Sequence, residues 1–168
     1  MVYAHLGRLV NAWAVGGGLF ILAIVFVTTA NVSLFALDRV ARPFGGTVSG
    51  LPGYEDVVSL AVSCAALMFF PLCQLRRGHV AVDVFTEKLP KHLQCGLDQL
   101  WSAAASLLAL FLGYWMLLGM LESRNDGALS PVIGWPLWPF YLPGIVSLLL
   151  WCLVAALQAM GKGAHGNP

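Results

Sequence analysis

The chain alternates between four long apolar stretches and short polar connections. The apolar stretches are residues 10–37, 57–75, 100–121 and 138–160. Roughly 20 apolar residues cross the hydrocarbon core of a bilayer as a helix, so each stretch is long enough to span a membrane. The connections are too short to fold as a separate soluble domain. The pattern therefore predicts an all-α integral membrane protein with four transmembrane helices, which form a single membrane domain over residues 1–168.

The composition agrees with a membrane protein and excludes other classes. Hydrophobic residues make up 59% of the chain and charged residues 10%, whereas soluble domains contain about 25% charged residues. The net charge of +1 gives no reason to expect a nucleic acid partner. The first apolar stretch exceeds the roughly 7 to 15 apolar residues of a signal peptide, and no A-x-A-like cleavage site follows it. We therefore expect it to be a span.

Basic residues are divided unevenly between the two sides that four spans define. Six Lys and Arg residues fall on the side of the termini and the middle connection, and three fall on the side of the first and third connections. Because Lys and Arg favour the cytoplasmic face, both termini are predicted to be cytoplasmic, including the tail 161–168. The first and third connections are then expected outside.

A short amphipathic segment precedes the third span. After Pro90, the apolar residues Leu93, Leu97 and Leu100 recur at helical spacing among polar residues, which predicts an interfacial segment between the second and third spans. If this segment continues into the span, a helix over 91–121 is about 46 Å long and exceeds the hydrocarbon thickness. We expect such a helix to tilt strongly or to break near the membrane surface.

Small residues in the first two spans predict close helix packing, because small side chains let helices approach each other in lipid. There are two such groups: Gly16, Gly17 and Gly18 in the first span, and Ser59, Ser63 and Ala66 in the second. Asn31, in the outer half of the first span, is expected to hydrogen-bond to another helix rather than to a ligand.

Charged residues next to the spans leave alternatives open. Glu55 opens the second span, where the positive end of the helix dipole favours an acidic residue. The alternative is an ion pair between Glu55 and Arg39 that pins the first two helices together. In the middle connection, His79 and Asp83 lie four residues apart and could share a helical face. Two ligands without a third do not predict a metal site.

The spans lack the side chains that catalysis or charge transport requires. None of the four apolar stretches contains Asp, Glu, Lys, Arg or His, whereas proteins that carry charged solutes usually place such groups inside their spans. No histidine lies deep enough to bind haem, and the four cysteines form no C-x-x-C pair. We therefore expect no enzyme activity, cofactor, metal site or substrate-binding residue. The residues alone favour a subunit that functions by packing.

Two motifs resemble a family of transporter subunits. One is Leu51-Pro52-Gly53-Tyr54-Glu55, and the other is FPLCQLRRGHVAVD at residues 70–83. With Arg39, Leu89-Pro90 and the aromatic, proline-rich stretch 136–144, they make residues 10–160 similar to the small permease (Q-type) subunit of TRAP (tripartite ATP-independent periplasmic) transporters. The Gly-rich connection 45–53 departs from the family, in which many members have a short Trp-containing stretch at this point.

The resemblance implies a location and partners. It implies a multi-pass protein of the bacterial inner membrane that is part of a secondary active transport system. A periplasmic solute-binding protein of such a system delivers an organic anion, such as a dicarboxylate or a sugar acid. A large multi-span permease imports this anion by symport with sodium. The small subunit resembles a stator or scaffold, with the large permease, the binding protein and membrane lipids as its partners.

The resemblance also implies roles for six residues. Arg39 and Glu55 match outer-face charges of the family and are predicted to orient the first two helices or to face the binding protein. Four inner residues are predicted to anchor the cytoplasmic interface and to contact lipid headgroups or the large permease: Arg76, Arg77, His79 and Asp83. The alternative function is a free-standing four-helix scaffold or assembly protein that buries its small-residue faces in a homo-oligomer.

Overall fold

A computed structural model describes residues 2–76 and 91–161 of the chain. These residues are mainly helical. Four helices in this part of the chain are long and apolar enough to cross a membrane. They are α1 (Val2–Ala41), α2 (Tyr54–Leu75), α4 (Lys91–Asn125) and α5 (Tyr141–Ala159). The short 3-10 helices η1 (Arg42–Phe44) and η2 (Trp138–Phe140) follow α1 and precede α5. The predicted all-α fold with four membrane-spanning helices is confirmed.

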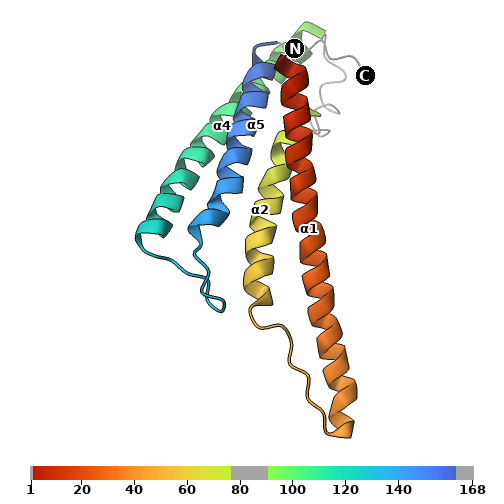
Figure 1. The fold of residues 1–168 in the computed structure, drawn as a ribbon. Coiled ribbons are helices and arrows are strands. Elements are labelled where there is room, and N and C mark those ends of the chain that lie inside the picture. Colours follow the sequence, from red (N-terminus) through yellow and green to blue (C-terminus); the bar gives the residue numbers. More distant parts are fainter. Residues whose placement is uncertain (1, 77–90, 162–168) are drawn as a thin grey trace.

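The helices α2 and α5 lie at the centre of the arrangement. α2 packs against both α1 and α5, and α4 packs against α5 (Figure 1). In the most apolar window of each helix, 33% of the α2 residues and 39% of the α5 residues are buried, compared with 6% in α1 and in α4. α1 and α4 therefore expose most of their apolar side chains, as helices do that face lipid or a partner within a membrane.

Small residues bring α1 and α2 together near the middle of the bundle. A Cβ atom added at Gly16 or at Gly17 would lie 3.0 Å from the Met68 side chain, whereas one added at Gly18 would have no neighbour within 4 Å. The prediction of a close helix approach is thus confirmed for Gly16 and Gly17. Gly18 faces away from this contact.

The small residues predicted to form the packing face of α2 do not lie on its buried side. Ser59, Ser63 and Ala66 are all exposed. α2 instead buries Ala61 and Ala65. These alanines begin two positions after the predicted stripe, which is about 200° around a helix of 3.6 residues per turn. The prediction therefore fails for contacts within the chain.

The helices α1 and α4 are longer than the apolar stretches that predict them. α1 has 40 residues and α4 has 35, which correspond to about 60 Å and about 52 Å. Both lengths exceed the roughly 30 Å of a hydrocarbon core. The amphipathic segment after Pro90 is the first part of α4. Of the two expectations for such a long helix, tilting or breaking, the continuous helix excludes breaking.

We name the two ends of the molecule by their predicted orientation, outer for the end of the first and third connections and inner for the end of the termini. The outer end of α1 projects well beyond the first turn of α2 (Figure 1). The connection 45–53 runs back along this projecting part to reach α2, and the connection between α4 and α5 lies at the same end of the bundle. α1 begins and α5 ends at the opposite end. In the described part of the chain, the residues predicted to face outside therefore lie at the opposite end of the long axis from those predicted to face inside.

Candidate functional site

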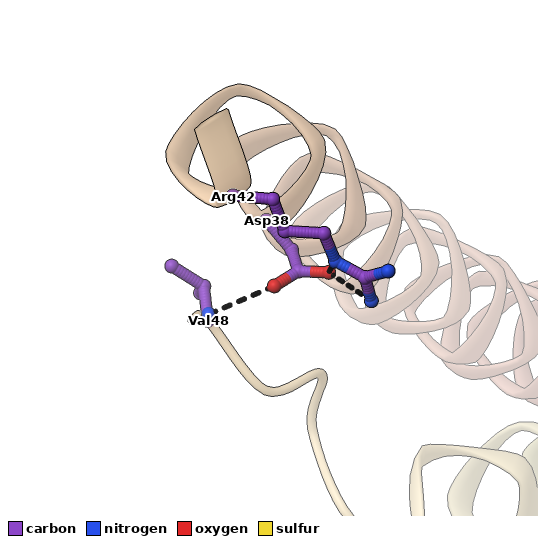
Figure 2. A network of polar contacts seen from close by, with 3 residues as sticks. All are labelled: Asp38, Arg42 and Val48. Atoms are coloured by element: carbon purple, nitrogen blue, oxygen red, sulfur yellow. Dashed lines mark hydrogen bonds and ion pairs between the residues drawn. The ribbon is translucent and has the colours of Figure 1, made fainter. Parts of the chain in front are cut away.

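The outer end of α1 is tied to the following connection by Asp38. One Asp38 carboxylate oxygen accepts a bond from Arg42 Nε at 2.8 Å, with Arg42 Nη2 at 2.7 Å. The other oxygen accepts the backbone N–H of Val48 at 3.0 Å (Figure 2). Residues four apart lie on the same side of a helix, so Asp38 and Arg42 stabilise the end of α1 while Asp38 also holds the connection.

Asn31 makes a second tie between α1 and the same connection. Its side-chain oxygen accepts the backbone N–H of Leu51 at 2.9 Å, and the residue is 2% exposed. The expected bond to another helix is therefore wrong: the partner of Asn31 is a loop amide. A Cβ atom at Gly50 would come within 2.9 Å of Asn31 Oδ1 and of the Phe35 ring, so glycine allows the backbone to approach α1 here.

Asp56 holds the other outer connection. One of its carboxylate oxygens accepts the backbone N–H groups of Val132 and Ile133 at 2.9 and 3.0 Å. Gly53, which precedes α2, has a φ of 76°, a left-handed conformation that favours glycine. A Cβ atom at Gly53 would clash with the Ile133 side chain. The connection between α4 and α5 is therefore fixed against the start of α2.

Arg39 and Glu55, the predicted outer-face charges, lie next to these anchoring aspartates but do not anchor the loops. Both are exposed, and neither has an ion-pair partner among the residues that the structure describes. The alternative of an ion pair between Arg39 and Glu55 is therefore wrong. Glu55 lies in the first turn of α2, where the helix dipole favours it. Their roles toward a partner remain predictions.

Two buried glutamines join α2 and α5 at the inner end. Gln74 Nε2 donates to Gln158 Oε1 at 2.7 Å, and Gln158 Nε2 donates to the backbone carbonyl of Gln74 at 2.9 Å. Trp151 Nε1 donates to Gln74 Oε1 at 3.1 Å. Because buried polar groups are costly unless they are hydrogen-bonded, these bonds fix the relative position of the two helices.

The structure describes the inner motif, residues 70–83, only over residues 70–76. Arg76 lies directly after α2, is exposed, and donates its backbone N–H to the carbonyl of Leu72 at 3.0 Å. The other predicted inner residues, Arg77, His79 and Asp83, lie outside the described residues. Within 2–76 and 91–161, no group of three His, Cys, Asp or Glu residues could hold a metal ion.

Sequence reasoning missed the residues that join the elements. One signal was present: Asp38 and Arg42 have the i, i+4 spacing of a helical ion pair. A second was the occurrence of a glutamine near the inner end of two apolar stretches, Gln74 and Gln158, since polar side chains in spans commonly bond across helices. The partners of Asp56 carry no such signal because they are backbone amides.

The sequence and the fold agree with one known family. The family model for the DctQ component of tripartite ATP-independent periplasmic transporters matches residues 24–162. The chain belongs to the DctQ family. It is thus a small membrane subunit of a TRAP transporter, a multi-pass protein from a family of transporter components. The matched range includes Asp38, Asp56 and both glutamines. No curated protein and no solved structure gives a significant match.

Proposed function

We propose that this DctQ chain is the stator of a TRAP transporter that imports an organic anion with sodium. It holds the large permease in the bacterial inner membrane while that subunit carries the ion and the substrate. A dicarboxylate, a sugar acid or a related carboxylate is the substrate class. A periplasmic binding protein delivers this substrate at the end of the molecule where α1 projects.

The observation that carries this proposal is the absence of charged side chains from the apolar stretches. None of these stretches contains Asp, Glu, Lys, Arg or His. Several buried polar side chains in the described part of the bundle bond to one another or to the backbone; for example, Trp13 Nε1 donates to Ser147 Oγ at 2.9 Å. An ion or a carboxylate crossing the membrane needs polar or charged groups along its path. Such groups therefore belong to another subunit.

The orientation that we propose places both termini in the cytoplasm. The excess of basic residues on the side of the termini and the middle connection supports it. Both outer connections are then periplasmic, where Arg39 and Glu55 are exposed toward the binding protein. Reporter fusions test this orientation. A C-terminal alkaline phosphatase fusion should be inactive and a C-terminal fluorescent protein fusion should be bright, and the reverse pattern would overturn it.

Uptake by membrane vesicles tests the transport role. Vesicles with the large permease and the binding protein should accumulate a labelled carboxylate under a sodium gradient only when this chain is present. Arg39→Ala and His79→Ala variants should lower uptake, whereas Ala23→Ser, on an exposed part of α1, should not. Equal uptake without the chain would contradict the stator role. Wild-type uptake and assembly by both variants would contradict the roles assigned to Arg39 and His79.

A further inference from the structure

An apolar groove lies between α2 and α4, and α5 forms its floor. It has a volume of about 290 Å³. Phe70 and Cys73 of α2 line one side, and residues of α4 line the other, with Trp151 of α5 beneath. The residues of α4 that line the groove include Trp101, Ala104 and Leu108. The side chains of Phe70, Trp101 and Leu108 are 42%, 53% and 50% exposed, so the groove is open to its surroundings.

The hydrogen bonds and ring contacts around Trp151 preform this groove. The Trp151 ring stacks on Phe70 with a centroid distance of 5.0 Å, and its Nε1 donates to Gln74. The ring is therefore held in one orientation and does not turn to fill the space. Ala104, which is exposed, leaves the opposite wall open. A preformed apolar groove accepts an apolar ligand at little cost in conformational entropy.

The position of the groove in the membrane favours a phospholipid. Cys73 and Trp101 lie at the inner ends of the stretches 57–75 and 100–121, so the groove begins at the inner surface of the hydrocarbon core. Arg76 follows Cys73 by three residues, is exposed, and has no ion-pair partner among the described residues. Basic side chains beside grooves between spans on this face recognise anionic headgroups.

The size of the groove suits a single hydrocarbon chain, because its volume is about 290 Å³. A benzene ring fills a cavity of about 150 Å³. The groove therefore has room for a stretch of one flexible hydrocarbon chain.

We propose that the groove between α2 and α4 binds one acyl chain of an anionic phospholipid whose phosphate lies against the Arg76 guanidinium. This proposal rests on the orientation proposed above but not on the stator role, because every residue that it uses belongs to this chain. The bound lipid fills the space between α2 and α4 that the side chains of α5 leave open. It also extends the inner surface of the subunit with a negatively charged headgroup.

Native mass spectrometry of the purified full-length chain tests the proposal, with dioleoylphosphatidylglycerol and dioleoylphosphatidylcholine as probes. The wild-type chain should retain one phosphatidylglycerol with about fivefold preference over phosphatidylcholine, the effect of one basic residue at a membrane surface. Ala104→Trp fills the groove and should weaken this binding about tenfold. Ala23→Trp, on the exposed side of α1, is the matched control and should bind like wild type.

The charged part of the site has its own variant. Arg76→Gln should remove the preference for phosphatidylglycerol, whereas Arg8→Gln, an exposed arginine of α1, should keep it. Arg76→Gln changes an exposed side chain, so it keeps the proposal testable if Ala104→Trp does not fold. Unchanged lipid binding by a folded Ala104→Trp, or an unchanged preference in Arg76→Gln, would overturn the proposal. Loss of the large permease from Ala104→Trp with lipid binding intact would overturn it in favour of a protein occupant.

Discussion

At the scale of single residues, the outer end of the molecule separates anchoring charges from exposed ones. Asp38 and Asp56 accept backbone N–H groups of the two outer connections. A carboxylate is a strong acceptor for such donors, which a loop otherwise leaves to water. Arg39 and Glu55 occupy the adjacent positions and are exposed. Each pair thus combines one residue that fixes a loop with one that is exposed at the surface.

Substitution of Asp56 distinguishes these two kinds of residue. In Asp56→Ala, hydrogen exchange at the amides of Val132 and Ile133 should accelerate by on the order of tenfold, because both amides lose a charged acceptor. Glu55→Ala should leave these amides unchanged. Hydrogen–deuterium exchange of the purified protein, read by mass spectrometry of peptides that cover 126–137, measures both. Equal exchange in wild type and Asp56→Ala would show that the carboxylate does not hold the connection.

The anchoring role of these aspartates was not predictable from the sequence. Asp56 and Ile133 are 77 positions apart, and the bond depends on the approach of α5 to α2, which no local pattern encodes. The family motif contains Glu55, whereas its neighbour Asp56 makes the bonds to the loop. Only the Asp38–Arg42 pair had a local signal, the i, i+4 spacing.

At the scale of elements, two different kinds of contact hold the helices together. Side-chain hydrogen bonds join the inner ends of α2 and α5, whereas glycines, which have no side chain, let α1 approach α2 closely. Gln74 and Gln158 exchange two hydrogen bonds across the α2–α5 interface. Gly16 and Gly17 let α1 approach Met68. Both kinds of contact suit a membrane, where helices associate through close packing and interhelical hydrogen bonds rather than through the hydrophobic effect.

Substitution of one glutamine tests the hydrogen bonds between α2 and α5. Gln158→Ala should lower the free energy of unfolding by about 1–3 kcal/mol, because it removes two interhelical bonds that are each worth roughly 0.6 to 1.7 kcal/mol in a membrane. Gln99→Ala, which changes an exposed glutamine of α4, should have no measurable effect. Unfolding by SDS titration in mixed micelles gives both values. Equal stability of the two variants would mean that the buried bonds contribute nothing to the fold.

Enlarging adjacent glycines tests the middle contact. Gly17→Leu should destabilise the fold, since its Cβ alone would lie 3.0 Å from Met68 Cβ and the rest of the side chain would push α1 away from α2. Gly18→Leu should be tolerated, because nothing lies within 4 Å of its Cβ. Melting of the two variants in detergent should place Gly17→Leu below wild type and Gly18→Leu near it. Similar melting temperatures would disprove the contact.

The existence of the four spanning helices was predictable from the sequence, whereas their lengths and the faces that they bury were not. The four apolar stretches predicted the spanning helices because hydrophobicity over about 20 residues is a strong signal. α1 extends to Ala41, past the apolar stretch 10–37, and Asp38 in its last turn pairs with Arg42, the first residue of η1. The stripe of Ser59, Ser63 and Ala66 was assigned to packing on residue size alone, and size does not specify which face of α2 meets α1 and α5.

At the scale of the whole molecule, two central helices carry the internal contacts and two flanking helices expose apolar faces. α1 and α4 lie on different sides of the α2–α5 pair (Figure 1), so a membrane partner can reach either of them. The four apolar stretches contain no Asp, Glu, Lys, Arg or His. This composition fits the proposed stator better than a carrier of charged solutes, which usually has such groups inside its spans. The proposed stator role therefore depends on a second, larger subunit in the same membrane.

Affinity purification of the tagged chain from its native membrane in mild detergent tests this dependence most directly. Mass spectrometry should identify a large multi-span permease that co-elutes in about equal amount, as the stator role predicts. The opposite result is recovery of the chain alone, or as a homo-oligomer, from membranes in which such a permease is shown to be expressed. That result would contradict the stator role and favour a free-standing four-helix scaffold.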